Sequence, residues 1–490
     1  MRVLGIHCGH DASAAVVEDG KVLWAIEEER LTGFKKHGGF PANAIMQISK
    51  NLGCSTWNYD KVMIASPSLH WGRMHAEDTN KHLDMYPDAE IVEHHECHAA
   101  LAYAWSGFDE CTTLTLDGGG EHYFGSINHC KDGKIERIYS LRKDECEAFG
   151  MFYYYVTESL GFTPNRHEGK VMGLAAHGRD TGIFDDLFRA DGQMIRTDGG
   201  RNDYVVFRRL EERTNKDSSS IRGVDVATSC QKHFEDVLLK WVFDNTQGKL
   251  AVAGGCFANV LANMKIARKV EDFYVAPPML DDGLSIGAAL LGFPTLPVGY
   301  QKDVYLGPSQ EPRQENRKTP IEVAKLLSQG AVVGLFQGRM EMGPRALGNR
   351  SILADPRDHR INTILNKRLG RTEFMPFAPV ILDEYASDIL IGYDKGKLNG
   401  PFMTSCWEVR EEWLAKIPAV VHIDRTARPQ VISRDTNPFY YDVVNEFYKI
   451  TGIPALINTS LNGHESPIAC FQKEVDFMMG NGQIDVLVEN

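Results

Sequence analysis

Short apolar runs separated by glycine turns dominate the beginning of the chain. Residues 2–6 form the first run, residues 12–17 the second and residues 22–26 the third. A turn containing Gly and Asp separates the first two runs. Asp19-Gly20, a hairpin turn signal, separates the second from the third. This pattern predicts three consecutive strands.

A second copy of this pattern begins at residue 111. An apolar run leads into the turn Asp117-Gly118-Gly119-Gly120, a further run follows, and Asp132-Gly133 precedes a third. Two units with the same order of strand, glycine turn, strand, hairpin turn and strand predict a duplicated domain. Two unrelated hairpins are the alternative.

The duplicated plan is that of the actin and hexokinase fold, whose two glycine-containing hairpins hold phosphate groups from opposite sides of a cleft. Glycine suits this task because its backbone N–H can approach an anion with no Cβ in the way. Such a fold also needs an adenosine loop. Residues 249–266 fit that loop, with a strand, then Gly254-Gly255, then a helix that opens through Asn259.

The regular pattern of apolar residues ends near Phe293. Residues 292–320 contain five prolines and no clear apolar period. We therefore predict an N-terminal domain at 1–295, a junction at 296–319 and a second α/β domain at 320–490. The second domain is expected to begin with a helix at 321–327 and a strand at 331–336.

Composition narrows the class of protein. The chain is 43% hydrophobic and 24% charged, an ordinary globular mixture that excludes a disordered chain, a collagen, a coiled coil and a disulfide knot. No apolar run approaches the roughly 18 residues of a membrane helix, and the N-terminus does not read as a signal peptide. Ten cysteines without a C-x-x-C pair indicate reduced thiols in a cytoplasmic protein.

The overall charge argues against a nucleic-acid or membrane partner. The chain has 53 basic and 66 acidic residues, a net charge of −13. Binding to a phosphate backbone or to anionic lipid needs a broad basic surface. We therefore expect neither partner.

One cluster of residue types indicates a metal site. His94 and His98 lie four positions apart at the start of an Ala-rich segment, so a helix would place both imidazoles on one face. Asp117 is a natural third ligand, and Asp281 or Asp282 a fourth. Two histidines with two aspartates suit iron(II), manganese or zinc. Buried, hydrogen-bonded histidines with two capping aspartates are the alternative.

Charged residues near the glycine turns are further candidates. His10 is placed to act as a general base in the first turn, unless Asp11 merely caps that turn and His10 is simply exposed. Lys36, which precedes His37, is a further candidate. Glu168 and Lys170 precede a helix, where they suit a phosphate or a substrate, or else form a solvated face.

The C-terminal part is rich in arginine beside Gly, Pro, Ser and Asn, a combination that resembles an anion clamp. In an acidic chain this local basic cluster argues for a small polyanion such as a nucleotide, although surface arginines are the alternative. The members are Arg339, Arg345, Arg350 and Arg357, then Lys367, Arg368 and Arg371, then His422, Arg425, Arg428 and Gln430, and last residues 458–462.

Taken together, these segments resemble the O-carbamoyltransferase family of nodulation-factor and antibiotic biosynthesis, the NodU/TobZ type. The resemblance covers nearly the whole chain. It rests on GHDASAAV with EEER, EHHECHAA, LDGGGE, EGKVMGLA, AGGCFANV, DDGLSIGAA, EMGPRALGNRSIL, EFMPFAP, HIDRTARPQ and NTSLNGHESPI.

The resemblance implies a fold for each domain. The N-terminal domain would be similar to tRNA threonylcarbamoyl transferase, itself of the actin-like fold. The C-terminal domain would be similar to the YrdC fold, which makes acyl-adenylates and carries a K-x-R and S-x-N signature. Ser460 and Asn462 match S-x-N, whereas Lys367, Arg368 and Arg371 remain alternatives for K-x-R. The family's metal ligands correspond to His94, His98, Asp117 and Asp281, with iron(II) as the expected metal.

The implied activity is ATP-dependent O-carbamoyl transfer. Carbamoyl phosphate and ATP, with Mg²⁺, would give carbamoyl-adenylate, and a hydroxyl of a sugar, antibiotic or other natural product would accept the carbamoyl group. A kinase of the actin-like fold and a tRNA-modifying fusion are alternatives, and a homo-oligomer stays open. The catalytic candidates are His10, Asp11 and Lys36. The candidates for binding nucleotide or carbamoyl phosphate are Gly118, Gly119, Gly120, Glu168, Lys170, Gly254, Gly255, Asn259, Arg345, Arg350, Lys367, Arg368, Arg371, Arg428, Ser460 and Asn462.

Overall fold

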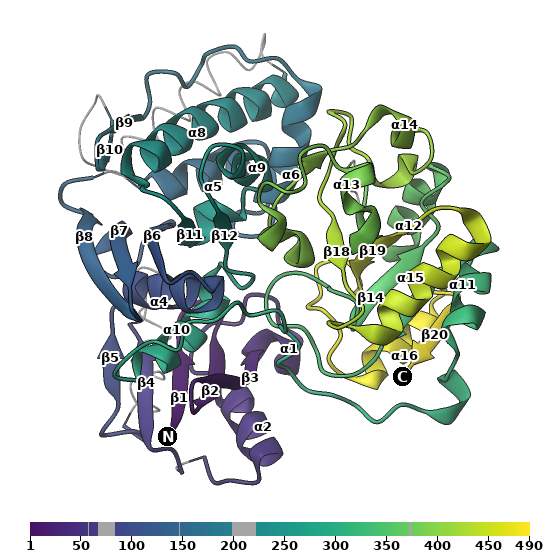
Figure 1. The fold of residues 1–490 in the computed structure, drawn as a ribbon, viewed down its shortest axis with the longest axis horizontal. Helices are drawn as coiled ribbons and strands as arrows, with labels where there is room; N and C mark the ends of the chain where they lie inside the picture. Colours follow the sequence, from purple (N-terminus) through teal and green to yellow (C-terminus); the bar gives the residue numbers. More distant parts are fainter. Residues whose placement is uncertain (57, 67–83, 147, 198–221, 372–374) are drawn as a thin grey trace.

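Five strands from the beginning of the chain form the first sheet of this computed structural model, in the order β3-β2-β1-β4-β5 (Figure 1). The structure describes residues 1–490 except 57, 67–83, 147, 198–221 and 372–374. The strands are β1 (Arg2–His7), β2 (Ser13–Glu18), β3 (Lys21–Glu27), β4 (Lys61–Ala65) and β5 (Glu90–Val92). The first three are antiparallel neighbours, and β4 and β5 continue the sheet in parallel. The three strands predicted at the N-terminus are confirmed.

The second sheet repeats this arrangement. Its order is β12-β11-β6-β7-β8, so β6, β7 and β8 occupy the places of β1, β2 and β3. Again the first three strands are antiparallel and the last two are parallel to the first. The strands are β6 (Glu110–Leu116), β7 (Tyr123–Lys131), β8 (Lys134–Arg142), β11 (Leu250–Ala253) and β12 (Phe273–Val275). The predicted duplication and the actin-like fold are confirmed.

Two helices lie between these sheets. α4 (His94–Ser106) packs on β6 and β11, α10 (Leu284–Leu291) packs on β1, β2 and β4, and the two helices pack on each other (Figure 1). Nine of the thirteen residues of α4 are apolar or small, and all thirteen except Glu96 are buried. Glu93 caps its first turn by accepting from the backbone N–H groups of His95 and Glu96.

The outer faces of the two sheets are covered by further helices. α2 covers the first sheet, and α5, α8 and α9 lie over the second (Figure 1). Their bounds, with those of the short helices of this half, are α1 (Glu28–Thr32), α2 (Ala42–Leu52), α5 (Phe149–Ser159), α6 (Glu168–Leu174), η2 (Ala175–His177), α8 (Gly223–Asn245), η3 (Gly255–Ala258), α9 (Val260–Ala267) and η4 (Asp281–Gly283). A small hairpin adds β9 (Arg189–Asp191) and β10 (Met194–Arg196).

Glycine permits the close contact between the two central helices. A Cβ added at Gly287 of α10 would lie 2.0 Å from the carbonyl oxygen of Cys97 in α4. A Cβ at Gly5 of β1 would lie 1.9 Å from the carbonyl oxygen of Ser285. Side chains larger than hydrogen therefore cannot occupy these positions without moving backbone.

The second domain is built on a six-stranded mixed sheet in the order β18-β15-β19-β14-β13-β20. Its strands are β13 (Val333–Phe336), β14 (Arg350–Ala354), β15 (Ala378–Leu382), β18 (Gln430–Ile432), β19 (Ala455–Ser460) and β20 (Val486–Glu489). Its main helices are α11 (Pro320–Ser328), α12 (Arg360–Leu369), α15 (Pro438–Thr451) and α16 (Gln472–Gly480). The predicted helix at 321–327 and strand at 331–336 are confirmed as α11 and β13.

Local signals explain where this domain begins. Thr319 and Glu322 form a reciprocal capping box at the start of α11, and Pro320 occupies the first helical position. The remaining short elements are η5 (Gln314–Asn316), η6 (Asp383–Tyr385), α13 (Ala386–Ile389), η7 (Lys397–Phe402), β16 (Trp407–Glu408), α14 (Glu411–Leu414), η8 (Pro418–Val420) and β17 (Thr426–Ala427).

A buried ion pair of the N-terminal domain bonds to the backbone of the second domain. Arg30 of α1 donates to the Glu27 carboxylate at 3.0 Å and to the carbonyl oxygen of Gly343 at 2.9 Å. Gly343 donates its backbone N–H to the same Glu27 carboxylate at 2.9 Å. Glu27 and Arg30 are both buried, so these bonds are shielded from water and salt.

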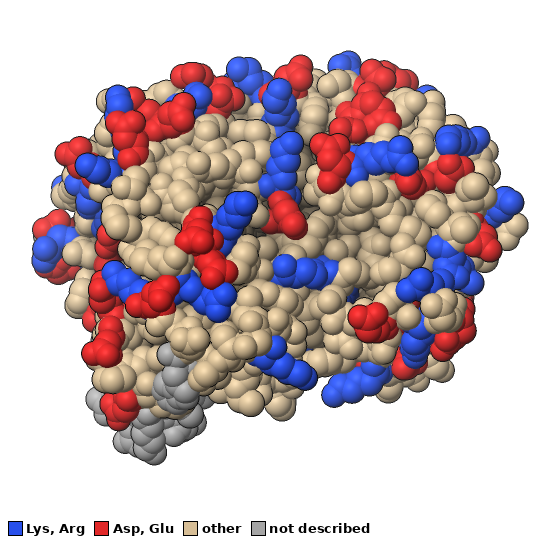
Figure 2. Space-filling view, turned by 60° about the horizontal axis from the view of Figure 1, so that its bottom comes forward, with Lys and Arg blue, Asp and Glu red and all other residues tan. Residues whose placement is uncertain are grey.

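The surface carries charges of both signs. Figure 2 shows Lys and Arg side chains interspersed with Asp and Glu over one face of the molecule, without a broad patch of either sign. Of the helices that the structure describes, none is both long and apolar enough to cross a membrane.

The contact at Gly287 generates a stability prediction. Gly287→Ala places a methyl group against the Cys97 carbonyl, so we expect the free energy of unfolding to fall by about 1–3 kcal/mol, the usual cost of overpacking. Gly480→Ala is the matched control, because nothing lies within 4 Å of its added Cβ. Denaturant titration of both variants measures the difference. Equal stability of the two would contradict the tight helix contact.

Candidate functional site

A cavity of about 980 Å³ lies between the two domains. Its lining comes from the glycine turns and α6 on one side and from the arginine-rich loops and the end of β19 on the other. Among the predicted residues, it is lined by His10, Asp11, Lys36, Asp117, Gly118, Gly119, Glu168, Lys170, Gly255, Asn259, Asp281, Arg345, Arg371, Arg428, Ser460 and Asn462.

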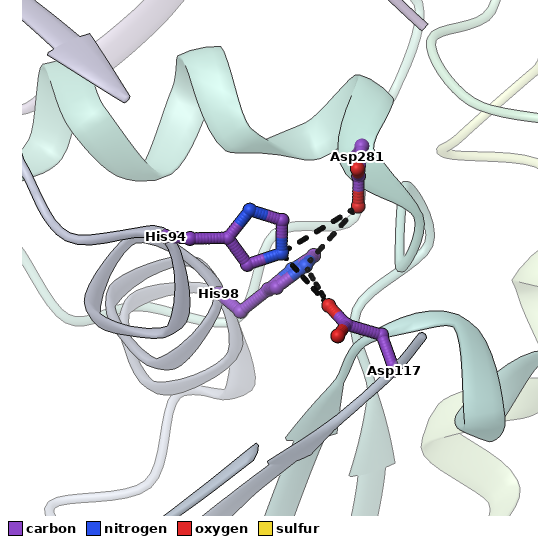
Figure 3. Close-up of side chains that lie close together, drawn as sticks. All are labelled: His94, His98, Asp117 and Asp281. Carbon is purple, nitrogen blue, oxygen red and sulfur yellow. Dashed lines mark hydrogen bonds and ion pairs between the residues drawn. The ribbon is translucent and has the colours of Figure 1, made fainter. Parts of the chain in front are cut away.

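The predicted metal ligands converge on one another (Figure 3), and two of them, Asp117 and Asp281, line this cavity. His94 and His98 project from the first turns of α4, Asp117 follows β6, and Asp281 begins η4. The Nε2 atom of His94 lies 2.7 Å from one oxygen of Asp117 and 3.7 Å from Asp281. The Nε2 atom of His98 lies 3.4 Å and 3.6 Å from the same two carboxylates. One ligand atom from each residue falls within 4.8 Å of all the others.

Buried charge explains the ionisation of this cluster. Burial favours neutral groups, but the neighbouring imidazoles hold the pKa of Asp117 well below its usual value. Burial likewise lowers the pKa of His98, and its interactions with Asp117 and Asp281 outweigh this and raise it to about 9. Two adjacent carboxylates thus require positive charge beside them. Two imidazole nitrogens and two carboxylate oxygens also fit a borderline divalent cation.

His95 and His7 are buried histidines beside this cluster with other roles. His95 lies 3.0 Å from the hydroxyl of Thr115 and 3.0 Å from the carbonyl oxygen of Tyr123, so both ring nitrogens have partners. His7 contacts the carbonyl oxygen of His10 at 3.1 Å. Burial lowers the pKa of each to about 4, which keeps both neutral. The sequence analysis did not single out His7.

A chain of polar side chains leads from the cluster along the first glycine turn. The His10 ring lies 3.3 Å from Asp281 through Nε2 and 3.0 Å from Asp11 through Nδ1. Lys36 donates to the same oxygen of Asp11 at 2.6 Å. Burial opposes charge here, but Asp11 raises the pKa of Lys36 to about 12. The three predicted catalytic residues are thus in contact and adjoin the metal cluster.

Asp282 lies beside Asp281 but in a different environment. Both line the cavity, and only Asp281 belongs to the His/Asp cluster among the described residues. Burial and the nearby Glu27 and Asp11 raise the pKa of Asp282 well above its usual value. The surroundings of Asp282 therefore favour its neutral form, whereas those of Asp281 favour its charged form.

Some glycines of the predicted phosphate-binding loops line the cavity, and others pack against neighbouring residues. Gly118, Gly119 and Gly255 line the cavity. Gly120 packs against the His94 side chain, and an added Cβ would lie 2.8 Å from it. Gly254 has a φ of 105°, a conformation that residues with a side chain rarely adopt, and it packs against the backbone of Leu116. Any residue other than glycine would therefore be strained at this position.

Asn259, Glu168 and Lys170 complete the N-terminal side of the cavity. Asn259 caps α9 through Ala262 and donates to Gln231 at 2.9 Å. Glu168 accepts the backbone N–H of Asn165, and burial raises the pKa of its carboxyl. Lys170 is a buried residue of α6 that lines the cavity.

Arg345 and Arg428 approach the cavity from the second domain without acidic partners. Neither forms an ion pair with any carboxylate in the part of the chain that the structure describes. Burial lowers the pKa of both Arg345 and Arg428, and the neighbouring Arg428 lowers that of Arg345 further. Because a guanidinium group stays protonated in proteins, two unpaired cations face this part of the cavity. Such a place attracts an anion.

Arg371 is held by the end of β19. Its guanidinium donates to the Thr459 hydroxyl at 2.9 Å and to the Asn462 side chain at 2.7 Å. The Ser460 hydroxyl donates to the same Asn462 oxygen at 2.6 Å. Arg371 is therefore the one of the three K-x-R alternatives that the structure brings to the S-x-N segment.

Arg350, Lys367 and Arg368 lie away from the cavity. Arg350 is fully buried, donates to the carbonyl oxygens of Gln337 and Asn349 at 2.6 and 2.8 Å, and so joins backbone segments. Arg368 pairs with Asp485 at 2.8 Å on the surface, and Lys367 is exposed. The sequence placed these three residues in one basic cluster, but their environments depend on partners that are distant in the sequence.

Two further pairs of charged or polar side chains line the cavity, and of their members only His422 belongs to the cluster predicted from the sequence. His167 lies 2.8 Å from Glu465 and so joins the two domains across the cavity. Burial raises the pKa of Glu465, but the bond to His167 and the charge of Lys35 lower it to about 2. His422 with Asp424 is the second group. Their His-x-Asp spacing was the available signal.

Comparison with known proteins places this arrangement in a family. Nodulation protein NolNO of Sinorhizobium fredii is 32% identical, over 94% of this chain and 75% of that protein. Nodulation protein U of Rhizobium tropici is 36% identical, over 98% and 95%. Nodulation protein NolO of Bradyrhizobium diazoefficiens is 35% identical, over 77% and 74%.

Solved structures give more distant likenesses. Component A of (R)-2-hydroxyglutaryl-CoA dehydratase from Acidaminococcus fermentans is 15% identical with a TM-score of 0.38, over 59% of this chain and 97% of that one. HypF of T. kodakarensis is 15% identical with a TM-score of 0.36, over 59% and 47%. Scores this low add nothing to the repeated strand order.

Two family models cover almost the entire chain. The model described as Carbamoyltransferase N-terminus matches residues 2–77 and 68–290. The model described as Carbamoyltransferase C-terminus matches residues 324–490. The two matched regions carry the two sides of the cavity, and the chain belongs to the carbamoyltransferase family.

Proposed function

We propose that this carbamoyltransferase works in two ATP-dependent half-reactions. In the first, carbamoyl phosphate yields carbamate, which attacks the α-phosphate of ATP and gives carbamoyl-adenylate and pyrophosphate. In the second, a hydroxyl of a small-molecule acceptor takes the carbamoyl group and AMP leaves. The observation that carries this proposal is one cavity lined by both the unpaired arginines and the two aspartates of the His/Asp cluster.

The arginine side of the cavity suits the first half-reaction. Both substrates are polyanions, and Arg345 and Arg428 offer positive charge that no described carboxylate neutralises. Preorganised cations of this kind stabilise the charge that develops on transferring phosphates. Arg371, Ser460 and Asn462 form a rigid donor group on the same wall.

The opposite side suits the transfer step. His10 contacts Asp11 and Asp281, which orient its ring, and it would take the proton from the acceptor hydroxyl. Lys36 holds Asp11 in its charged form. The Gly118–Gly119 turn, together with Gly255, would hold the departing AMP through backbone N–H groups.

The His/Asp cluster would hold a divalent metal, which we propose to be iron(II). His94, His98, Asp117 and Asp281 would be its ligands, since their donor atoms already converge. When bound, the ion would supply Lewis-acid polarisation of the carbamoyl carbonyl. The chain's own contribution is to keep the four donors buried and fixed on α4, β6 and η4.

A shared cavity favours the use of an unstable intermediate. A mixed anhydride such as carbamoyl-adenylate is readily hydrolysed in water, so a short path between the two steps limits its loss. Because both walls line one cavity, the adenylate would pass directly from the arginine side to the opposite side. We propose Mg²⁺ as the partner of ATP in the first step.

One prediction of the proposed function separates the two half-reactions. Arg345→Ala or Asn462→Ala removes donors from the arginine side, so we expect loss of pyrophosphate release and of transfer. His10→Ala should still release pyrophosphate while transfer falls about 10²–10⁴-fold, the usual contribution of a general base. Pyrophosphate and carbamoylated product are measured together, with hydroxylated acceptors screened by mass spectrometry.

Arg360→Ala serves as the matched control for this series. Arg360 is exposed and pairs only with Asp358 among the described residues, so both half-reactions should be unchanged. Release of ADP in place of AMP and pyrophosphate would instead indicate a kinase. Equal loss of pyrophosphate release in the His10 and Arg345 variants, with both folded, would refute the two-sided scheme.

The second prediction concerns the metal. A His94→Ala/His98→Ala double variant removes both imidazole donors, so we expect the metal content of anaerobically purified protein to fall from about one equivalent to none. The double variant His122→Ala/His359→Ala is the control, because both side chains are exposed. Elemental analysis decides, and unchanged metal in the first variant would disprove the assignment.

The third prediction concerns nucleic acid. The chain has a net charge of −13, and the face in Figure 2 carries charges of both signs without a broad basic patch, whereas a phosphate backbone requires a basic face. We expect no tight binding of tRNA in filter-binding assays at low and moderate salt. Tight binding that weakens steeply with salt would favour a tRNA-modifying enzyme.

A further inference from the structure

A tight turn at residues 422–426 presents a histidine and an aspartate to the cavity. His422 donates its backbone N–H to the carbonyl oxygen of Thr426 at 2.8 Å, and Arg425 donates to the carbonyl oxygen of His422 at 2.9 Å. Arg425 adopts a φ of 67°, the left-handed conformation that closes the turn. The turn therefore holds the side chains of His422 and Asp424 on the same side.

The Asp424 carboxylate fixes the orientation of the His422 ring. One oxygen of Asp424 lies 3.2 Å from Nδ1 of His422, and it accepts the backbone N–H and the hydroxyl of Thr426 at 2.9 and 2.7 Å. A carboxylate held by two other donors cannot rotate away from the ring. Nδ1 therefore carries the proton, and Nε2 is the basic nitrogen.

The Nε2 atom of His422 has no hydrogen-bond partner among the described residues, although it is buried. A buried ring nitrogen without a partner costs free energy, so a water or a substrate group is its expected partner. His422 lines the cavity together with Arg345 and Arg428. Asp424 lines the same cavity, so the His422–Asp424 pair and the two unpaired arginines share it.

We propose that His422 is a catalytic base for the cleavage of carbamoyl phosphate, with Asp424 as its positioning residue. This inference rests on the proposed function and adds a step to it. A water molecule attacks the carbamoyl carbon, a new C–O bond forms there, and the C–O bond to phosphate breaks. Of the two protons of water, Nε2 takes one and the leaving phosphate takes the other, which gives carbamate and hydrogen phosphate.

A purely structural role is the competing explanation. The ring of His422 packs edge-on against His177 of the N-terminal domain, with the ring centroids 5.9 Å apart. This contact needs the shape of the ring but not a basic nitrogen. The two roles are separable, because a structural defect would impair the reaction whatever the source of carbamate.

The test compares two carbamoyl sources in the His422→Asn variant, whose side-chain amide retains a donor for Asp424. With carbamoyl phosphate and ATP, we expect pyrophosphate release to slow by about 10²–10⁴-fold. With ammonium carbamate and ATP, the variant should match the wild type, because the cleavage step is bypassed. Arg345→Ala should stay inactive with both sources, and His359→Asn, at an exposed site, should stay fully active.

Asp424→Asn gives a second measurement. Its amide oxygen still accepts from Thr426, so the turn is retained, but the charge that favours protonated Nδ1 is lost. We expect a smaller loss with carbamoyl phosphate and none with carbamate. The inference is overturned if the His422 variant is slow with both sources, or if it is as fast as the wild type with carbamoyl phosphate. A wild type that releases no pyrophosphate from either source would overturn the proposed function as well.

Discussion

The contact between α4 and α10 is the constraint on which the rest of the site depends. The His pair lies on α4, and Asp281 lies immediately before α10, so the separation of the two helices sets the separation of the ligands. That separation is small because Gly287 lets backbone touch backbone. A protein interior packs like a crystal and relaxes little. The side chains of His94, His98 and Asp281 are therefore positioned by two packed helices in the core of the duplicated domain.

The arginines of this chain fall into two groups: those that pair with a carboxylate and those that face the cavity without one. Arg30 is matched by Glu27, three residues before it, and Arg313 is matched by Glu489, which is distant in the sequence. Arg345 and Arg428 have no such match among the described carboxylates. Partly burying a charge without a counter-charge costs free energy. The fold bears that cost at the cavity wall, where an anionic substrate would offset it.

Much of the fold could be predicted because its signals are local. The Asp19-Gly20 and Asp132-Gly133 turns determine the strand boundaries around them, and the i,i+4 spacing of His94 and His98 needs only a helix to become a site. The environment of an arginine is different, because it depends on distant partners. Arg350 donates to main-chain carbonyls and Arg368 pairs with Asp485. The residues next to each arginine in the sequence give no sign of these contacts. The same holds for His422, whose significance comes from the cavity beside it.

The size of the interdomain cavity has a kinetic consequence. A single molecule confined to about 980 Å³ is present at an effective concentration on the order of 1 M. An intermediate made at the arginine wall would meet the His/Asp wall at that concentration, although its concentration in solution stayed near zero. Its supply would then be independent of dilution of the enzyme. The rate of transfer would be governed by how often a suitable hydroxyl enters the cavity, so selection among acceptors becomes a matter of entry and fit.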